Sequence, residues 1–221
     1  MAFRGAIFDL DGTVLDSMTV WDHVLPNFLR GKGFALEPGL MNEVAGMTFT
    51  ESSNYVKTLY GLAESPEEIQ TAWCEEARRQ YAEEVVEKEG ASNFIRALKA
   101  ADIRLSVATT CMRDLAEAAL EHLQLSFLLN PVFYADELRM NKRDPWIYEL
   151  CAKAMGVLPS ECAVFEDSYG TLDAVRKAGM KFVGVFDEKN AANEARLRRE
   201  GDLFVTHWDG LTVAQIARLF S

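Results

Sequence analysis

Short apolar runs alternate with amphipathic segments along the second half of the chain. The runs are only a few residues long, as buried strands are, whereas the segments between them repeat their apolar residues every three or four positions, as helices do. The pattern predicts helices at residues 115–123, 171–178 and 213–220, another that begins at Asp144 and Pro145, and strands at residues 103–108, 132–134, 163–165, 182–186 and 203–205.

Regular exchange of strands and helices is typical of a parallel sheet that is covered by helices on both faces. The apolar run at residues 3–8 predicts a further strand near the start of the chain. We therefore expect an α/β fold with a doubly wound, Rossmann-like parallel sheet. Ligands of such sheets bind beyond the carboxyl ends of the strands, which is where candidate site residues should be sought.

A helical insert follows the first strand. Residues 20–29 have helical periodicity that ends at a Gly-Lys-Gly segment. A second, longer helix should open at Ser65 and Pro66, because Ser65 can cap it and Glu68 can complete a capping box. Its apolar positions continue to Val85, and Gly90 should end it.

Composition and charge favour a globular protein and disfavour nucleic-acid-binding and membrane proteins. The 221 residues are 49% hydrophobic and 26% charged, which is typical of a folded globular protein. The 34 acidic residues outnumber the 23 basic ones, for a net charge of −11, so the basic surface that nucleic acid requires is lacking. No apolar stretch approaches the roughly 20 residues of a membrane span. We expect neither nucleic acid nor a membrane as a partner.

The cysteines give no sign of disulfides or zinc. There are 4, with no CxxC pair and no companion His at zinc-ligand spacing, and no secretory leader precedes the first strand. We expect reduced thiols and a cytoplasmic location. Cys111 lies near candidate site residues, but a small buried apolar side chain is the commoner role of a free cysteine, so we assign it no chemistry.

Two carboxylates, Asp9 and Asp11, follow the first strand and precede Gly12. Residues two apart on a strand point the same way, and two adjacent anions are costly unless a cation or a shared proton compensates. One carboxylate can attack an electrophile or bind a metal, while the other carries a proton to a leaving group. The alternative is an acidic turn without chemistry, because Asp and Gly are common turn residues.

Further polar residues follow later strands or precede helices. Thr109 and Thr110 follow one predicted strand, Glu166 and Asp167 follow another, and Lys142 lies in a loop before a helix. Taken singly, they could be a helix cap, an acidic helix start and a surface lysine. Together with the first carboxylate pair, they place hydroxyls, a cation and acidic groups at one edge of the sheet. Such an edge can bind phosphate, and its hard oxygen ligands select Mg²⁺.

The order and spacing of these residues resemble the four motifs of the haloacid dehalogenase (HAD) superfamily of phosphohydrolases. The matching segments are Asp9-Leu10-Asp11-Gly12-Thr13, then Thr109, then Lys142, then Glu166-Asp167-Ser168. The resemblance covers nearly the whole chain. It implies a Rossmann-like catalytic core of residues 1–16 and 89–221 and an inserted helical cap of residues 17–88. It also implies a Mg²⁺ cofactor and a small phosphorylated metabolite as substrate.

The resemblance implies a role for each matching residue. Asp9 would be the nucleophile that forms an aspartyl-phosphate, and Asp11 the general acid that protonates the leaving alcohol and later activates water. Physical chemistry agrees, because Mg²⁺ and Lys142 favour an ionised Asp9, whereas an anionic neighbour favours a protonated Asp11. The phosphoryl oxygens would be held by Thr109, Lys142 and the amides of the Asp11-Gly12 turn, with Thr110 beside them. Mg²⁺ would be held by Asp9, the backbone carbonyl of Asp11, Glu166 and Asp167.

Two departures from the family pattern bear on function. The usual Lys-Pro-x-Pro-Asp around the third motif reads Lys142-Arg143-Asp144-Pro145-Trp146, so the loop should have a different shape. The fourth motif has Glu-Asp rather than Gly-Asp, which resembles the sugar-phosphate phosphatase and beta-phosphoglucomutase branch. We therefore expect a Mg²⁺-dependent phosphatase for a small sugar- or polyol-phosphate-like monoester, acting as a monomer or small homo-oligomer.

Three alternatives remain: a phosphomutase, a dehalogenase and a non-catalytic binding module. The intact acidic cluster disfavours a binding module, and the second aspartate of the first motif disfavours a dehalogenase. Against a mutase, the histidine of beta-phosphoglucomutases falls on Trp21. Their arginine, which follows a Gly-x-Ser turn, falls on Phe49 after Gly46-Met47-Thr48. Trp21 and Phe49 are expected to contact the substrate or to pack the interior of the cap.

Overall fold

The computed structural model describes residues 2–44 and 47–221, and the chain divides into two compact units. The first unit comprises Met1–Met18 and Val85–Ser221, and the second comprises Thr19–Glu84. The helical insert predicted for residues 17–88 corresponds in sequence to the second unit. That this unit acts as a cap stays a prediction.

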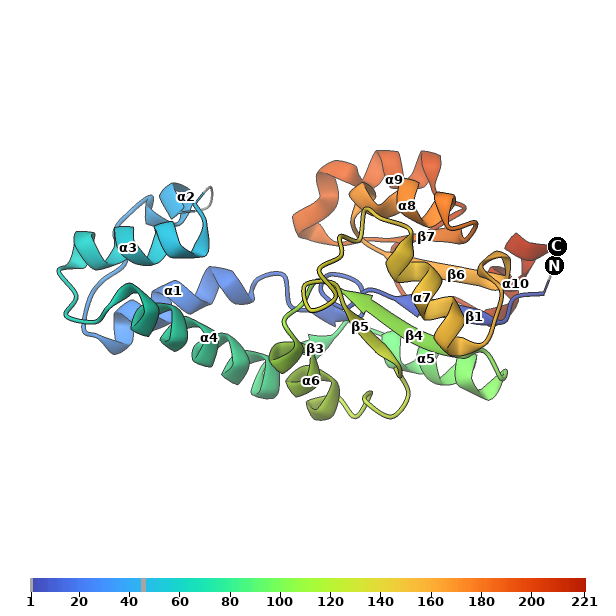
Figure 1. The fold of residues 1–221 in the computed structure, drawn as a ribbon, viewed down its shortest axis with the longest axis horizontal. Helices are drawn as coiled ribbons and strands as arrows, with labels where there is room; N and C mark the ends of the chain where they lie inside the picture. The colour runs from blue at the N-terminus through green and yellow to red at the C-terminus, as the bar shows by residue number, and fades with distance from the viewer. Residues whose placement is uncertain (1, 45–46) are drawn as a thin grey trace. The chain divides into compact units, whose positions relative to one another are not determined.

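The first unit is built on a six-stranded sheet with the strand order β5-β4-β1-β6-β7-β8 (Figure 1). All five strand pairs are parallel. A central first strand with neighbours from later in the chain confirms the predicted doubly wound α/β fold. The strands are β1 (Gly5–Phe8), β4 (Arg104–Thr109), β5 (Val132–Tyr134), β6 (Cys162–Glu166), β7 (Lys181–Val185) and β8 (Leu203–Val205).

Alternation along β1 supplies both layers of the core, because successive strand residues face opposite sides of the sheet. Ile7 joins a cluster that includes Tyr148 and Val175, from helices on one face. Phe8 stacks on Phe165 with ring centroids 4.7 Å apart and belongs to an aromatic group with Trp208. The helices of this unit are α5 (Ala91–Ala100), α6 (Arg113–His122), α7 (Trp146–Met155), α8 (Leu172–Lys177), α9 (Glu194–Glu200) and α10 (Val213–Ala217).

The second unit consists of α1 (Val20–Gly31), α2 (Leu40–Val44), α3 (Phe49–Tyr60) and α4 (Pro66–Glu83), and α4 packs against both α1 and α3. The predicted helix start at Ser65 is confirmed, because the Ser65 hydroxyl accepts the Glu68 N–H while the Glu68 carboxylate accepts the Ser65 N–H. Trp73 of α4 contacts Phe28 edge-on, with ring centroids 6.1 Å apart.

The prediction that the long helix continues to Gly90 is wrong. Helix α4 ends at Glu83, and β3 (Val86–Glu87) pairs antiparallel with β2 (Leu15–Asp16). Extended pairing with the outgoing chain overrides the local helical pattern there, so the two connections between the units run side by side. Helix α7 begins at Trp146 rather than at the predicted Pro145. Asp144 Oδ1 nevertheless accepts the Trp146 N–H at 3.2 Å, as a capping residue does.

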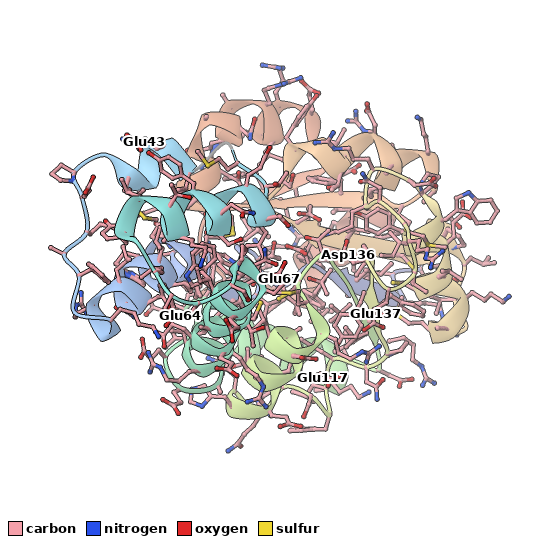
Figure 2. All side chains as sticks on the ribbon, turned by 60° about the vertical axis from the view of Figure 1, so that its left-hand side comes forward. Glu43, Glu64, Glu67, Glu117, Asp136 and Glu137 are labelled. Carbon is pink, nitrogen blue, oxygen red and sulfur yellow. The ribbon has the colours of Figure 1, made fainter. Side chains whose placement is uncertain are left out.

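Acidic side chains lie at the surface of both units, such as Glu43 and Glu67 in the helical unit and Glu117 and Glu137 in the sheet unit (Figure 2). Glu117 and Glu137 both pair with Arg113 of α6. Among the described helices, none combines the length and apolarity that crossing a bilayer would require.

Candidate active site

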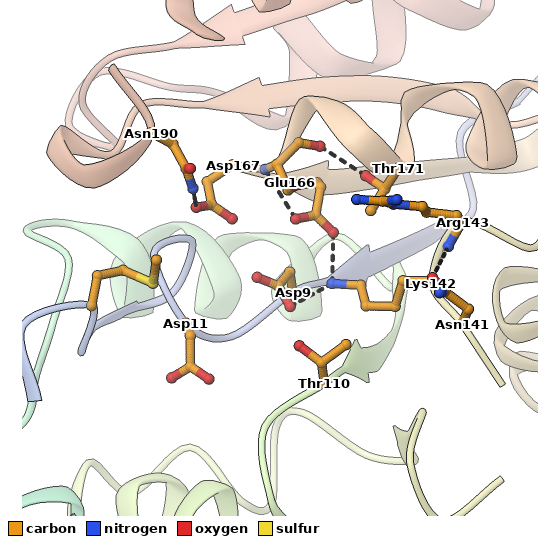
Figure 3. A pocket seen from close by; sticks show the side chains of 12 residues that line it. Asp9, Asp11, Thr110, Asn141, Lys142, Arg143, Glu166, Asp167, Thr171 and Asn190 are labelled. Carbon is orange, nitrogen blue, oxygen red and sulfur yellow. Dashed lines mark hydrogen bonds and ion pairs between the residues drawn. The ribbon is translucent and has the colours of Figure 1, made fainter. Parts of the chain in front are cut away.

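A pocket of about 510 Å³ lies at the carboxyl ends of the central strands, within the sheet unit. Six of the residues predicted from sequence line it (Figure 3). These are Asp9, Asp11, Thr110, Lys142, Glu166 and Asp167. The topology explains the convergence, because β1, β4 and β6 are adjacent parallel strands whose ends share one edge of the sheet.

Lys142 links two of the carboxylates. Its Nζ atom lies 2.6 Å from Asp9 Oδ1 and 2.6 Å from Glu166 Oε2, and all three side chains are buried. Ligand oxygens of Asp9, Glu166 and Asp167 lie within 4.8 Å of one another. One lysine therefore pairs with two of three clustered carboxylates, which leaves an excess of negative charge that a divalent cation would balance.

Burial is the main influence on the acidity of this cluster. It raises the pKa of Asp9 to about 7, with a further contribution from Glu166, and that of Glu166 also to about 7. Burial, followed by the charge of Asp9, raises the pKa of Asp167 to about 6. Burial lowers the pKa of Lys142, but Asp9 and Glu166 outweigh it and hold that pKa well above its ordinary value. A cation among these oxygens would favour their ionised forms.

The carboxylates have the chemistry of a Mg²⁺ site. Hard carboxylate oxygens suit Mg²⁺, whereas zinc and copper prefer nitrogen or sulfur ligands. In the described part of the chain, the cluster contains no histidine or cysteine. The residues present thus fit the predicted cofactor, and Asp9, Glu166 and Asp167 are the side chains able to hold it.

Thr13 and Asn190 hold Asp167 in place, and sequence reasoning gave neither of them a role. The Thr13 hydroxyl accepts the Asp167 N–H at 3.1 Å, and the Asn190 side-chain amide donates to Asp167 Oδ2. Asn190 lies in the segment that follows β7. The expectation that site residues lie beyond the carboxyl ends of the strands therefore extends to it. Trp208 Nε1 in turn donates to the Thr13 carbonyl at 3.3 Å.

The backbone conformation and the close neighbours of Gly12 require a glycine at this position. Its φ of +79° favours glycine, and a Cβ atom there would lie 2.5 Å from Asp167 Oδ2. Any other residue would therefore displace a carboxylate of the cluster. A direct role of Gly12 in substrate binding stays a prediction.

The expectation that Asp9 and Asp11 point the same way is wrong. Strand β1 ends at Phe8, so the alternation of a strand does not extend through them. Asp9 points to Lys142, whereas Asp11 points away from that group and accepts a 2.5 Å hydrogen bond from the Ser17 hydroxyl (Figure 3). The carboxylate of Asp11 is accordingly absent from the three-carboxylate cluster, although it lines the same pocket.

The two threonines after β4 differ in their surroundings. Thr109 is 1% exposed, and its hydroxyl accepts the backbone N–H of Cys111 at 3.0 Å. Thr110, by contrast, lines the pocket. The predicted phosphate-binding role of Thr109 stays a prediction, and Thr110 is the one of the two threonines that lines the pocket.

Trp21 and Phe49 lie in the helical unit. Their rings meet edge-on with centroids 5.9 Å apart, each residue is 39% exposed, and both line a separate pocket of about 390 Å³ within that unit. Gly46, on which the alignment of Phe49 partly depends, lies outside the described residues. Substrate contact by either ring stays a prediction.

The chain resembles known phosphatases over most of its length. Residues 6–185 match the haloacid dehalogenase-like hydrolase family. The chain is 25% identical to phosphorylated carbohydrates phosphatase of Thermotoga maritima, over 80% of this chain and 82% of that one. It is 29% identical to fructose-1-phosphate phosphatase YqaB of Escherichia coli, over 83% of this chain and 96% of that one.

A solved structure from Thermotoga maritima, provisionally assigned as a beta-phosphoglucomutase, has the same fold. Its TM-score is 0.84 at 24% identity, and the match covers 96% of this chain and 99% of that chain.

The chain belongs to the haloacid dehalogenase-like hydrolase family. The predicted superfamily and fold class are thereby confirmed, as is the prediction of an enzyme that hydrolyses phosphoric monoesters. The roles of individual residues stay predictions.

Proposed function

We propose that this chain is a Mg²⁺-dependent phosphatase that hydrolyses a small sugar- or polyol-phosphate through an aspartyl-phosphate on Asp9. The observation that carries the proposal is the buried group of Asp9, Glu166, Asp167 and Lys142, with Asp11 lining the same pocket. The substrate class is supported by the two curated relatives, whose names specify phosphorylated carbohydrates and fructose 1-phosphate.

In the first step, a carboxylate oxygen of Asp9 attacks phosphorus, and the bond from phosphorus to the alcohol oxygen breaks. Asp11 donates its proton to that oxygen, so that the leaving group departs as a neutral alcohol. Lys142 lies against Asp9 and is placed to stabilise negative charge on the phosphoryl oxygens.

In the second step, Asp11 accepts a proton from water, and the water oxygen attacks phosphorus. The bond between Asp9 and phosphorus breaks, which restores Asp9 and releases inorganic phosphate. The hydrogen bond from Ser17 fixes the orientation of Asp11 for both proton transfers. When bound, Mg²⁺ supplies positive charge that lowers the cost of bringing a phosphate dianion against buried carboxylates.

The test of this function is hydrolysis of p-nitrophenyl phosphate and of a panel of sugar, polyol and nucleoside monophosphates. We expect phosphate release with Mg²⁺ and none with EDTA, and the highest kcat/KM among the sugar and polyol phosphates. Hydrolysis that persists in EDTA would contradict the metal dependence, and a clear preference for nucleotides would contradict the substrate class.

Removal of Asp167 should weaken activation by metal. We expect Asp167→Ala to raise the Mg²⁺ concentration for half-maximal activity by about 10- to 100-fold or more, because a hard cation loses an anionic ligand. Asp173→Ala, at an exposed position of α8, is the matched control and should leave the titration unchanged. An unaltered Mg²⁺ titration of Asp167→Ala would remove Asp167 from the metal site.

Phosphoryl transfer to a second sugar hydroxyl is the competing activity. We expect no efficient conversion of beta-glucose 1-phosphate into glucose 6-phosphate, even with catalytic glucose 1,6-bisphosphate. The aromatic ring of Phe49 cannot grip a second phosphate as a guanidinium does. Efficient conversion without release of inorganic phosphate would establish a mutase instead.

A further inference from the structure

Lys88 forms a largely buried ion pair beside the strand that returns from the helical unit. Directly after β3, its backbone N–H donates to the Val14 carbonyl at 2.8 Å. Its Nζ atom lies 2.6 Å from Asp187 Oδ2 and donates to the Phe186 carbonyl at 2.9 Å. The two paired side chains are only 17% and 4% exposed, so this lysine is held in one place rather than solvated.

Asp187 organises the loop that follows β7. Its other carboxylate oxygen accepts the Lys189 N–H at 2.9 Å, and its carbonyl accepts the Asn190 N–H at 3.1 Å. These bonds start the short 3-10 helix η3 (Glu188–Asn193) that carries Asn190. The Asn190 amide then donates to Asp167. The ion pair of Lys88 therefore supports the loop whose Asn190 orients this carboxylate.

The contacts close into a ring. Asp167 donates its backbone N–H to the Thr13 hydroxyl at 3.1 Å, and Thr13 precedes Val14, whose carbonyl holds the backbone of Lys88. These contacts link four distant segments of the sequence, one of which carries Asp167, and all of them lie within the sheet unit. Mg²⁺ requires near-octahedral geometry, so a small rotation of this carboxylate should weaken binding.

We propose that Lys88 is a positioning residue for Asp167, acting through Asp187 and Asn190. The proposal rests on the proposed function, because it takes Asp167 to be a metal ligand. Stabilisation of the fold alone is the competing explanation, since a broken buried ion pair is destabilising wherever it lies. Mg²⁺ affinity distinguishes the two explanations.

The test is a double-mutant cycle on the full chain, with binding of Mg²⁺ alone measured by titration calorimetry in the absence of substrate. We expect Lys88→Met to raise the Kd for Mg²⁺ by about 3- to 10-fold and Asn190→Ala by about 10- to 100-fold, the usual range for groups that orient metal ligands. The double variant should bind as weakly as Asn190→Ala alone, because Lys88 acts only through Asn190.

Lys181→Met is the control, at a more exposed lysine–aspartate pair of the same strand. Lys181 pairs with Asp202 at 2.9 Å at the start of β7, whereas Lys88 pairs with Asp187 just beyond its end. This control should leave the Kd unchanged. If Lys88→Met does not melt cooperatively, Asp187→Asn replaces it with the same expected rise, since asparagine keeps an acceptor for the Lys189 N–H but loses the charge that holds Lys88.

An unchanged Kd in a folded Lys88→Met variant would overturn the proposal, and so would independent, additive effects of the two substitutions. Equal weakening by Lys181→Met would also overturn it, because any ion pair of this sheet would then suffice. Absence of saturable Mg²⁺ binding by the unaltered chain would instead contradict the metal site of the proposed function.

Discussion

Asp9→Asn is expected to abolish turnover. The amide is a poor nucleophile, and loss of a catalytic nucleophile costs about 10⁴-fold or more in kcat. Lys142 keeps Glu166 as its partner in the variant, so the fold should persist. The measurement is steady-state release of phosphate with saturating Mg²⁺, together with a melting curve that verifies folding.

Asp16→Asn is the matched control for this loss. It makes the same chemical change a short distance along the chain, at an exposed position of β2 outside the pocket. We expect its kcat to equal that of the unaltered enzyme. Near-normal turnover by a folded Asp9→Asn variant would contradict the assignment of the nucleophile.

Asp11→Asn should lower turnover by about 10²- to 10⁴-fold, the usual contribution of general acid–base catalysis. Asparagine retains an acceptor for the Ser17 hydroxyl, so the local structure should survive. The loss should depend on the leaving group. Nitrophenolate departs without a proton, so the first step persists with p-nitrophenyl phosphate, whereas an alkyl phosphate needs Asp11 in both steps.

Rapid mixing of Asp11→Asn with p-nitrophenyl phosphate should therefore give a burst of nitrophenol, close to one equivalent per enzyme, and then slow turnover. A sugar phosphate should give no burst. A change confined to KM, with kcat unaltered for both substrates, would show that Asp11 only binds.

Local signals explain what the sequence predicted well. The strands from β4 to β8 and the start of α4 are encoded by runs of neighbouring residues and by the Ser65 capping box, so their positions follow from periodicity and capping. The convergence of Asp9, Lys142 and Asp167 was predictable for a related reason, because parallel topology brings the carboxyl ends of strands to one edge.

Long-range contacts explain what the sequence did not predict. The pairing of β2 with β3 overrides a helical pattern, and nothing near Val86 indicates that its partner, Asp16, lies seventy positions earlier in the chain. Strand β1 ends at Phe8, so Asp9 and Asp11 point in different directions. The expectation that they point the same way assumed that the strand continued through them. Lys88 and Asn190 are ordinary polar residues until the fold places Lys88 against Asp187 and Asn190 against Asp167.

The most direct test of the central claim is mass spectrometry of the phosphorylated enzyme. Asp11→Asn is mixed with p-nitrophenyl phosphate and Mg²⁺, quenched in acid during the burst, and digested. We expect the added mass of one phosphoryl group on the peptide that contains Asp9, lost on treatment with hydroxylamine as an acyl phosphate should be. A burst without a phosphorylated peptide, or a phosphoryl group on another residue, would contradict catalysis through Asp9.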